Sequence, residues 1–286
     1  MKELCYITPN EKQLRSRMMD KTQERLLKVK HVFLDMDGTI YHGTQLFPTT
    51  IPFLDFLKGQ GIGYTFLTNN SSYGPEEYIA RLNRFGIKVG AENFYISSDY
   101  TVDYLKRNMP EVKRVYVLGM PCLARIMTEA GFEVVEEDPQ AVIVGFDREL
   151  VYSRLCQAAW FMRNDIPAIA THPDVFCPTD QPTWLVDCGA LIACLEKATN
   201  KKIKVLGKPD PGLLVEAAAR KGVDVTETMM CGDRLSTDIS LGVNAGALTC
   251  HIATPGADLI VPEGIVPDFS VLNLGEMQAI WEKALS

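Results

Sequence analysis

The sequence predicts a layered α/β protein: a doubly wound parallel sheet with a second, smaller α/β domain inserted into it. Short, continuously apolar runs alternate along the chain with longer stretches of helical spacing, a pattern typical of parallel strands covered by helices on both faces. Between two groups of such elements lies a separate set, from residue 90 to residue 199. Its roughly 110 residues are enough for a domain of their own.

The elements of the main domain follow from this pattern. Its strands are expected at His31–Asp35, Gly63–Thr68, Lys204–Lys208, Glu227–Asp233 and Leu248–Thr254. Its helices are expected at Pro52–Gln60, Pro75–Phe85, Pro211–Lys221 and Thr237–Ala245. Residues 31–89 and 200–286 would then form the main domain, preceded by a charged helical lead-in over residues 1–30 that is amphipathic from Met18 to Lys30.

The inserted domain, residues 90–199, has its own strands and helices. Strands are expected at Arg114–Gly119, Phe132–Glu137 and Ala141–Phe146, and helices at Leu150–Arg163 and Ala190–Thr199. The order of these elements again predicts a layered α/β unit.

Composition excludes several classes of protein. Apolar residues make up 47% and charged residues 23% of the 286 residues, which is ordinary globular usage. The net charge of −7 argues against binding a nucleic-acid polymer. There is neither an 18-residue apolar run nor an apolar N-terminal segment, so no membrane span or secretory signal is expected. The eight cysteines form no CxxC pair, which favours reduced thiols in a cytoplasmic protein.

Polar residues that suit phosphate chemistry follow four of the expected main strands. They are Asp35 and Asp37 after the first strand, Thr68 and Asn69 at the end of the second, Lys208 at the end of the third, and Asp233 and Asp238 after the fourth. Ligands of an open parallel sheet bind outside the carboxyl ends of its strands. The four segments therefore predict a single site.

The residue types in this site indicate a chemistry. Asp35, Asp37 and Asp233 would repel one another unless a cation lay between them, and an all-oxygen ligand set suits Mg²⁺. One carboxylate of the first pair can attack phosphorus, and the other can donate and accept protons. Thr68 offers a hydroxyl donor and Lys208 a positive charge for the phosphate.

Taken singly, each segment has a simpler interpretation. Asp-x-Asp-Gly is often a turn or part of a calcium loop, Thr-Asn-Asn a loop, Lys-Pro a helix entry and Gly-Asp a turn. An EF-hand is excluded because an apolar strand precedes Asp35 and the residue eleven positions later is Leu46 rather than Glu. The placement of all four segments at strand ends favours a functional site.

The four segments resemble the motifs of the haloacid dehalogenase-like hydrolase superfamily. They are DMDGT at 35–39, Thr68 in TNN, Lys208 in GKPDP, and GDRLSTD at 232–238. The resemblance extends over most of residues 31 to 255, and it is closer to the NagD-like, 4-nitrophenylphosphatase-type subfamily. In that subfamily a large α/β cap is inserted between the second and third motifs.

This resemblance implies a Rossmann-like core, a cap that folds over the site, and a role for each motif residue. Asp35 would be the nucleophile and Asp37 the general acid and base, with Thr68 and Lys208 holding the phosphate. Asn69 would orient the nucleophile or bind phosphate. Asp35, the main-chain carbonyl of Asp37 and Asp233 would coordinate Mg²⁺, with Asp238 supporting these ligands.

The sequence departs from the subfamily pattern in the cap. The cap loop usually begins Asn-Pro-Asp, but here it reads His172-Pro173-Asp174, and Asp187-Cys188-Gly189 follows where small residues are more usual. His172 would either contact substrate or be a solvated loop residue. Cys177 and Cys188 flank this loop, and they are interpreted either as packing residues or as redox-sensitive thiols.

The function expected from these features is a Mg²⁺-dependent phosphatase for small phosphomonoesters, such as a sugar phosphate or a nucleotide monophosphate. One alternative is a phosphotransferase or mutase that passes the phosphoryl group to a sugar hydroxyl. Another is a non-catalytic phosphometabolite sensor, which predicts the loss of residues such as Asp35 and Lys208, both of which are present. A homodimer through the cap or the N-terminal helix is compatible with the sequence.

Overall fold

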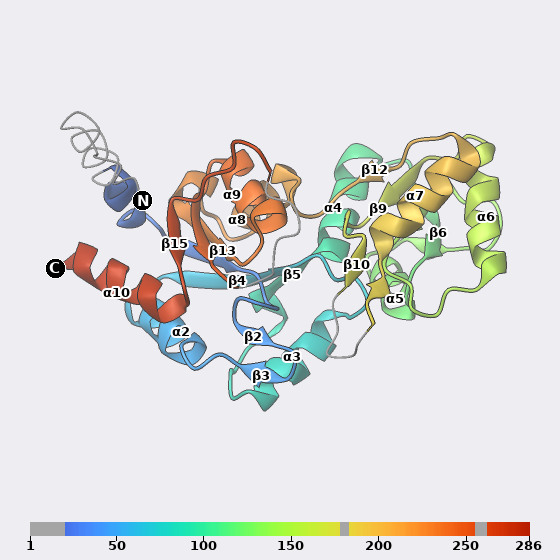
Figure 1. Cartoon of the computed structure of the whole chain (residues 1–286). Coiled ribbons are helices and arrows are strands. Elements are labelled where there is room, and N and C mark those ends of the chain that lie inside the picture. Colours follow the sequence, from blue (N-terminus) through green and yellow to red (C-terminus); the bar gives the residue numbers. More distant parts are fainter. Residues whose placement is uncertain (1–20, 178–182, 255–261) are drawn as a thin grey trace, which may run out of the picture.

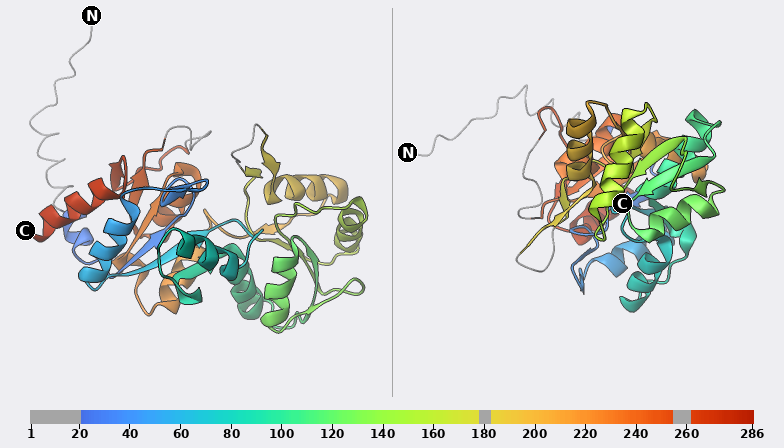
Figure 2. Two further views of the ribbon diagram at one scale, coloured as in Figure 1. Left: turned by 90° about the horizontal axis from the view of Figure 1, so that it is seen from below. Right: turned by 90° about the vertical axis from the view of Figure 1, so that its right-hand side faces the viewer.

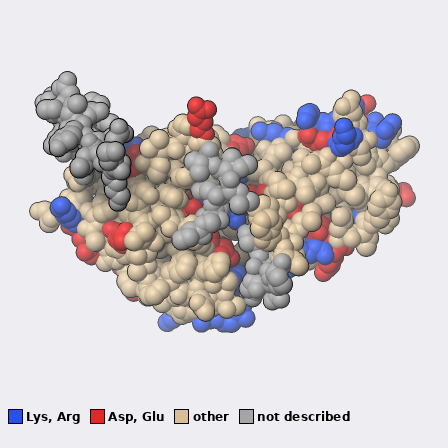
Figure 3. Space-filling model, viewed as in Figure 1, with Lys and Arg blue, Asp and Glu red and all other residues tan. Residues whose placement is uncertain are grey.

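The structure, a computed structural model, describes residues 21–177, 183–254 and 262–286. Two lobes lie side by side, each built around a parallel sheet (Figure 1). We call the lobe with the six-stranded sheet the core lobe and the lobe with the five-stranded sheet the cap lobe. Figure 2 shows the two lobes from two further sides, and Figure 3 shows how charged side chains are distributed over one face.

All six strands of the core-lobe sheet are parallel, in the order β15-β14-β13-β1-β4-β5. The strands are β1 (His31–Leu34), β4 (Gly63–Thr68), β5 (Phe94–Ile96), β13 (Thr228–Gly232), β14 (Leu248–Ile252) and β15 (Phe269–Val271). The strand β1 is buried along its whole length and lies between β13 and β4. The end of β1 is therefore near the centre of the sheet edge where ligands are expected to bind.

Helices cover both faces of this sheet, as the sequence predicts. They are α2 (Thr50–Gly59), α3 (Pro75–Arg84), α4 (Ser97–Asn108), α8 (Pro211–Arg220), α9 (Ser240–Ala245) and α10 (Leu274–Leu285), with short helical turns at Ala91–Asn93, Val225–Glu227 and Leu235–Ile239. The helices α2 and α10 pack together on one face, and α8 and α9 pack together on the other (Figure 1). The fully buried Trp281 of α10 meets Phe56 of α2 edge-on, with 5.9 Å between ring centroids.

The cap-lobe sheet is also parallel, in the order β12-β9-β8-β6-β7. Its elements are β6 (Arg114–Leu118), α5 (Pro121–Glu129), β7 (Glu133–Val134), β8 (Ala141–Val144), α6 (Tyr152–Arg163), β9 (Ala168–Ala170), α7 (Cys188–Thr199) and β12 (Lys204–Val205). Along β6, Tyr116 and Leu118 pack in a cluster with α6 and α7, whereas Val115 and Val117 join the apolar cluster of the core lobe. This alternation follows from the two-residue period of a strand, and it joins the two lobes through apolar packing.

Two short antiparallel hairpins stand apart from the large sheets. One pairs β2 (Tyr41–His42) with β3 (Gln45–Leu46), just after the first motif. The other pairs β10 (Phe176–Cys177) with β11 (Leu185–Val186), in the cap lobe. Between β10 and β11, residues 178–182 lie outside the described part of the chain.

The expectation of a core strand over Lys204–Lys208 is wrong. The strand β12 covers only Lys204–Val205, and it pairs with β9 at the edge of the cap-lobe sheet. Gly207 ends the extended run with φ +77°, and a side chain there would bring a Cβ to 2.6 Å from the carbonyl oxygen of Thr171. This left-handed residue turns the chain back toward the core lobe.

The sheets that β5 and β12 join can be compared with the expected domain bounds at residues 89 and 199. The strand β5 pairs with β4, so the core-lobe sheet continues past residue 89, and β12 extends the cap-lobe sheet past residue 199. The division at these two residues stays a prediction. Of the expected N-terminal helix, residues 21–26 are helical and Leu26 is buried, while residues 1–20 are outside the described range. None of the helices in the described ranges is long and apolar enough to cross a bilayer.

Candidate active site

The first and fourth motifs meet at the carboxyl ends of β1 and β13. Asp35 directly follows β1, and its main-chain N–H donates to the carbonyl of Cys231 over 2.8 Å. Asp233 directly follows β13. Between them, Gly38 has φ +84°, and a Cβ at that position would overlap the Asp233 carboxylate. Glycine therefore lets the loop that follows Asp35 pass against Asp233.

Three carboxylates gather here: Asp35, Asp233 and Asp238. All three are buried, and one oxygen of each lies within 4.8 Å of the others. Burial raises the pKa of Asp35 to about 7, with Asp238 adding to the rise. Burial also raises the pKa of Asp233 to about 8, and here the neighbouring Asp35 and Asp238 contribute. When all three carboxylates are ionised, the surrounding protein groups therefore do not fully stabilise their negative charge.

The ammonium group of Lys208 pairs directly with two carboxylates of this cluster. Its buried Nζ pairs with an oxygen of Asp35 and, over 2.7 Å, with an oxygen of Asp238. Burial alone would lower the pKa of Lys208, but Asp238 and Asp35 attract the proton more strongly and raise it. Lys208 is therefore an ammonium ion beside the nucleophile expected from the motif, although the strand that precedes it belongs to the cap lobe.

The donor set fits a hard divalent cation. Its ligands are all carboxylate oxygens and they are buried, and the two positive charges of Lys208 and the nearby Arg234 do not balance three carboxylates. Mg²⁺ prefers such oxygen ligands and commonly retains water molecules as well.

Asp37 lies apart from this cluster, contrary to the expectation that it would pack with Asp35 and Asp233. Its side chain is 62% exposed, and an oxygen lies 3.4 Å from Nδ1 of His42. The chain is not extended after Asp35, because the Met36 carbonyl accepts from the N–H of Ile40 over 2.9 Å in a tight turn. Asp238 takes the third position among the buried carboxylates.

The second motif contributes two buried residues at the end of β4. Thr68 lies beside the end of β1, and its Oγ1 accepts from the N–H of Asn70 over 3.2 Å. Asn69 contacts the main chain of Lys208 twice: Oδ1 accepts from the Lys208 N–H over 2.8 Å, and Nδ2 donates to the Lys208 carbonyl over 3.0 Å. The second and third motifs are thereby tied together.

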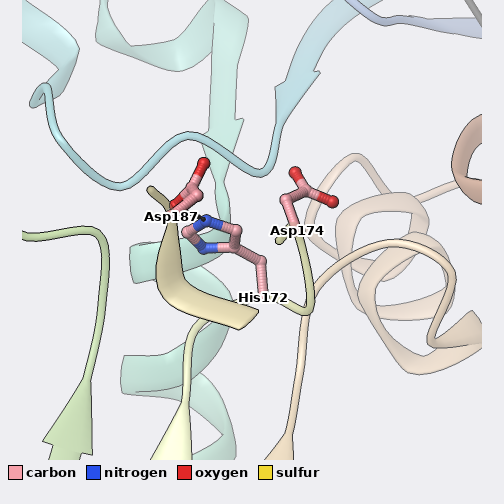
Figure 4. Close-up of side chains that lie close together, drawn as sticks. All are labelled: His172, Asp174 and Asp187. Carbon is pink, nitrogen blue, oxygen red and sulfur yellow. Dashed lines mark hydrogen bonds and ion pairs between the residues drawn. The ribbon is translucent and has the colours of Figure 1, made fainter. Parts of the chain in front are cut away.

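The cap loop brings a second polar cluster, formed by His172, Asp174 and Asp187 (Figure 4). His172 is fully buried, and both of its ring nitrogens are paired. Nδ1 lies 2.8 Å from Oγ1 of Thr171, and Nε2 lies 2.9 Å from Oδ1 of Asp187. A contact between His172 and substrate would break one of these pairs. His172 is also not a solvated loop residue, so neither of its two expected roles matches this geometry.

Asp187 and Gly189 explain the shape of this loop. Asp187 caps the N-terminus of α7, where its Oδ1 accepts from the N–H of Cys188 over 2.6 Å. A Cβ at Gly189 would overlap the carbonyl oxygen of Pro173. The loop and the start of α7 are therefore in close main-chain contact, which holds the Asp174 segment in place.

The two cysteines beside the loop have raised pKa values. Burial, with Asp187 and Asp37 adding to it, raises the pKa of Cys177 to about 11. Burial raises the pKa of Cys188 to about 12. Both groups stay protonated near neutral pH, and thiolates are the reactive form, so this environment favours the packing interpretation.

Sequence reasoning missed several of these contacts. Asp174 is not among the expected site residues, yet its Oδ1 accepts from Nδ2 of Asn69 over 3.3 Å, across the two lobes. Ser71 accepts hydrogen bonds at Oγ from Oγ1 of Thr171 over 3.2 Å and from the N–H of Phe146 over 3.0 Å. The only signal in the sequence that this region is unusual is the departure of the cap loop from the Asn-Pro-Asp pattern.

Comparisons with known proteins cover both lobes. Residues 32–133 match the family model described as haloacid dehalogenase-like hydrolase, and residues 205–263 match a HAD-hydrolase-like model. These two ranges include all four motifs. The chain is 33% identical over 257 residues to an acid sugar phosphatase of Staphylococcus aureus (strain MRSA252), covering 89% of this chain and 98% of the relative.

Solved structures agree with this assignment. The 4-nitrophenylphosphatase of Thermotoga maritima is 35% identical with a TM-score of 0.82, covering 89% of this chain and 98% of that one. NagD of E. coli K-12 is 31% identical with a TM-score of 0.79, covering 87% of this chain and 98% of that one. With the motifs, the sheet order and the relatives in agreement, the chain belongs to the haloacid dehalogenase-like hydrolase family.

Proposed function

We propose that this chain is a Mg²⁺-dependent phosphatase that hydrolyses small phosphomonoesters, sugar phosphates or nucleotide monophosphates, through an aspartyl-phosphate on Asp35. The observation that carries the proposal is the ion pair between Lys208 and Asp35 within a buried carboxylate cluster at the carboxyl end of the sheet. The similarity to an acid sugar phosphatase supports sugar phosphates as the first substrates to test.

The reaction has two steps, and both use Asp35 and Asp37. In the first, an Asp35 oxygen attacks phosphorus, the bond from phosphorus to the ester oxygen breaks, and Asp37 gives its proton to the departing oxygen. In the second, Asp37 takes a proton from water, the water oxygen attacks phosphorus, and the bond to Asp35 breaks. Inorganic phosphate leaves, and the Asp35 carboxylate and the protonated Asp37 are restored.

Lys208 keeps Asp35 in the form that attacks. A carboxylate must be ionised to act as a nucleophile, but burial raises the pKa of Asp35 to about 7. The charge of Lys208 and its hydrogen bond to Asp35 oppose this rise. Lys208 and the hydroxyl of Thr68 would also bind the phosphate oxygens, where charge-assisted hydrogen bonds are strong.

The metal would be held by Asp35, Asp233 and the main-chain carbonyl of Asp37. Asp238 would support these ligands and hold Lys208, with which it pairs. When bound, Mg²⁺ neutralises the carboxylates and polarises the phosphoryl group. Asp37, which is exposed toward solvent, is suited to exchanging protons with the leaving group and with water.

The cap lobe would limit the size of the substrate. Its loop reaches Asn69 at the end of β4 through Asp174, beside the phosphate-binding residues. A macromolecular phosphoester would have to displace this contact to bring its phosphate to Asp35.

The proposal is tested by measuring phosphate release from a panel of sugar phosphates, nucleotide monophosphates and p-nitrophenyl phosphate, with Mg²⁺ and with EDTA. We expect release that requires Mg²⁺ and is abolished in Asp35→Asn. Transfer of the phosphoryl group to an added sugar without phosphate release would indicate a phosphotransferase instead. Binding of phosphoesters with no turnover would indicate a sensor.

A further inference from the structure

Both N–H donors of the Asn69 side-chain amide are used within the protein. Its Oδ1 accepts from the Lys208 N–H (2.8 Å), and its Nδ2 donates both to the Lys208 carbonyl (3.0 Å) and to Oδ1 of Asp174 (3.3 Å). Its main-chain carbonyl accepts from Oγ of Ser97 over 2.7 Å, and the residue is only 4% exposed. A phosphate could reach the side-chain amide only by displacing one of its partners. The geometry therefore disfavours the side chain of Asn69 as a phosphate ligand.

The two contacts from Asn69 hold the main chain of Lys208 in place between the two lobes. Lys208 follows β12, which belongs to the cap-lobe sheet, yet its Nζ must reach Asp35 and Asp238 in the core lobe. The left-handed Gly207 precedes it. The double hydrogen bond from Asn69 fixes the Lys208 main chain against the end of β4, and so sets the point from which the side chain extends.

The third contact reaches the cap loop, which is itself held firmly. Asp174 follows His172, and that ring is fixed by Thr171 and Asp187. Oγ1 of Thr171 in turn donates to Oγ of Ser71, on the loop after β4. A movement of the cap loop would therefore also move the Asp174 carboxylate.

We propose that Asn69 is a positioning residue that couples the cap loop to Lys208. Through Asp174, the loop fixes the Asn69 amide; through its two main-chain contacts, that amide fixes Lys208 against Asp35. The catalytic part of this inference rests on the proposed phosphatase function, because Lys208 is the group that it positions. We call the hydrogen bonds that link Asp174, Asn69 and Lys208 the clamp. The clamp is a property of the folded protein and can be tested without turnover.

The first experiment compares Asn69→Asp, Asp174→Asn and the double variant. Asn69→Asp places two carboxylates where a 3.3 Å hydrogen bond now stands and removes the donor to the Lys208 carbonyl. Since misplacing a reacting group by 1 Å can cost about 100-fold in rate, we expect a loss of that order in kcat/KM at pH 7. Asp174→Asn alone gives a smaller loss, because its amide oxygen still accepts from Asn69.

The double variant separates positioning from phosphate binding. In it, the amide introduced at position 174 can donate to the carboxylate introduced at position 69. We therefore expect the double variant to recover about tenfold over Asn69→Asp, a coupling typical of residues in contact. As the pH is lowered from 7 to 5, the activity of Asn69→Asp should also rise relative to wild type. A proton shared by the two carboxylates, at positions 69 and 174, then removes the repulsion between them. If Asn69 were a phosphate ligand, the new carboxylate would repel phosphate in both variants, and the absence of recovery would overturn the proposal.

The second experiment needs no substrate and no metal. Hydrogen–deuterium exchange of the Lys208 amide in Asn69→Ala should rise at least about tenfold, because the Oδ1 acceptor is lost. Asp174→Ala, which leaves both contacts between Asn69 and Lys208 in place, should raise it by a smaller factor. Unchanged exchange in Asp174→Ala would contradict the coupling to the cap loop, even if Asn69→Asp proved too unstable to assay.

Asn70→Asp is the matched control for exchange. Asn70 is the neighbouring asparagine, and its Oδ1 accepts from the N–H and Oγ of Ser72, contacts that an aspartate retains. The change adds a negative charge one residue away, and exchange at Lys208 should stay at the wild-type rate. A wild-type protein without phosphatase activity would refute the proposed function, whereas the exchange results would still decide the clamp.

Discussion

Lys208 is the cation that pairs directly with the buried carboxylate cluster. Its ammonium pairs with Asp35 and Asp238, and no other lysine in the described part of the chain pairs with these two residues. Lys208 lies beside Asp35, as its motif led us to expect, but the strand before it was expected in the wrong sheet. A short apolar run that precedes a polar residue predicts a strand, but it does not predict which of the two sheets that strand joins. Both sheets are parallel, and both are built from such runs.

We expect Lys208→Met to lower kcat/KM by about 10²–10³-fold at pH 7, the usual cost of removing one strong donor from a charged site. The variant should also lose about 3–5 kcal/mol of unfolding free energy, because carboxylates are left buried without their partner. Both quantities should be measured beside Lys201→Met, which removes an exposed lysine paired with Asp165 in the cap lobe. Equal effects of the two substitutions would contradict the role of Lys208.

Gly38 is the residue that allows the loop after Asp35 to lie against Asp233. We expect Gly38→Ala to abolish most activity and to destabilise the protein more than Gly43→Ala does. Both glycines have positive φ, and a non-glycine residue in that conformation costs about 1–2 kcal/mol. Nothing lies within 4 Å of a Cβ at Gly43, whereas a Cβ at Gly38 would overlap the Asp233 carboxylate. Equal losses in thermal denaturation would contradict this account of the turn.

At the scale of elements, the central strands were predictable. The strands β1, β4, β13 and β14 lie where the continuous apolar runs place them, because strands buried on both faces need no alternation. The helices α4, α5 and α10 were not among the expected elements. The sequence of α4, SSDYTVDYLKRN, mixes polar and β-branched residues, and its position depends on packing against both α5 and α8.

Strand β1 also carries a titratable group that affects stability. Burial, with Lys221 adding to it, lowers the pKa of His31 to about 4, so the ring is neutral in the folded protein, where Nε2 lies 2.9 Å from Oγ1 of Thr65. In the unfolded chain the ring takes up a proton at about pH 6.5. The folded state therefore binds fewer protons. The contribution of His31 to stability is complete above about pH 6.5 and is lost as the pH falls toward about 4.

His31→Gln should flatten this dependence. Between pH 7 and pH 5, wild type should lose about 2 kcal/mol more unfolding free energy than the variant. The glutamine amide can still bond to Thr65, so packing and hydrogen bonding are largely kept. Urea denaturation at the two pH values measures the difference. Parallel losses in wild type and variant would show that His31 titrates alike in the folded and unfolded states.

For the whole molecule, the sequence could order the motifs but not the contacts between lobes. The alternation of elements predicted an inserted α/β unit, and both sheets are present. The cluster of His172, Asp174 and Asp187 could not be foreseen, because the His172–Asp174 loop and Asp187 belong to separate segments that meet only in the folded cap lobe. The same holds for the contact between Asp174 and Asn69, which are far apart in the chain and lie on different lobes.

The proposed mechanism requires Asp35 to carry the phosphoryl group. It is tested by quenching the protein during turnover of p-nitrophenyl phosphate with Mg²⁺, reducing it with borohydride and sequencing its peptides by mass spectrometry. Borohydride reduces an aspartyl-phosphate to homoserine. We predict homoserine at position 35 in wild type and unmodified peptide in Asp35→Asn. Turnover with homoserine at another aspartate, or with none at any position, would contradict the account.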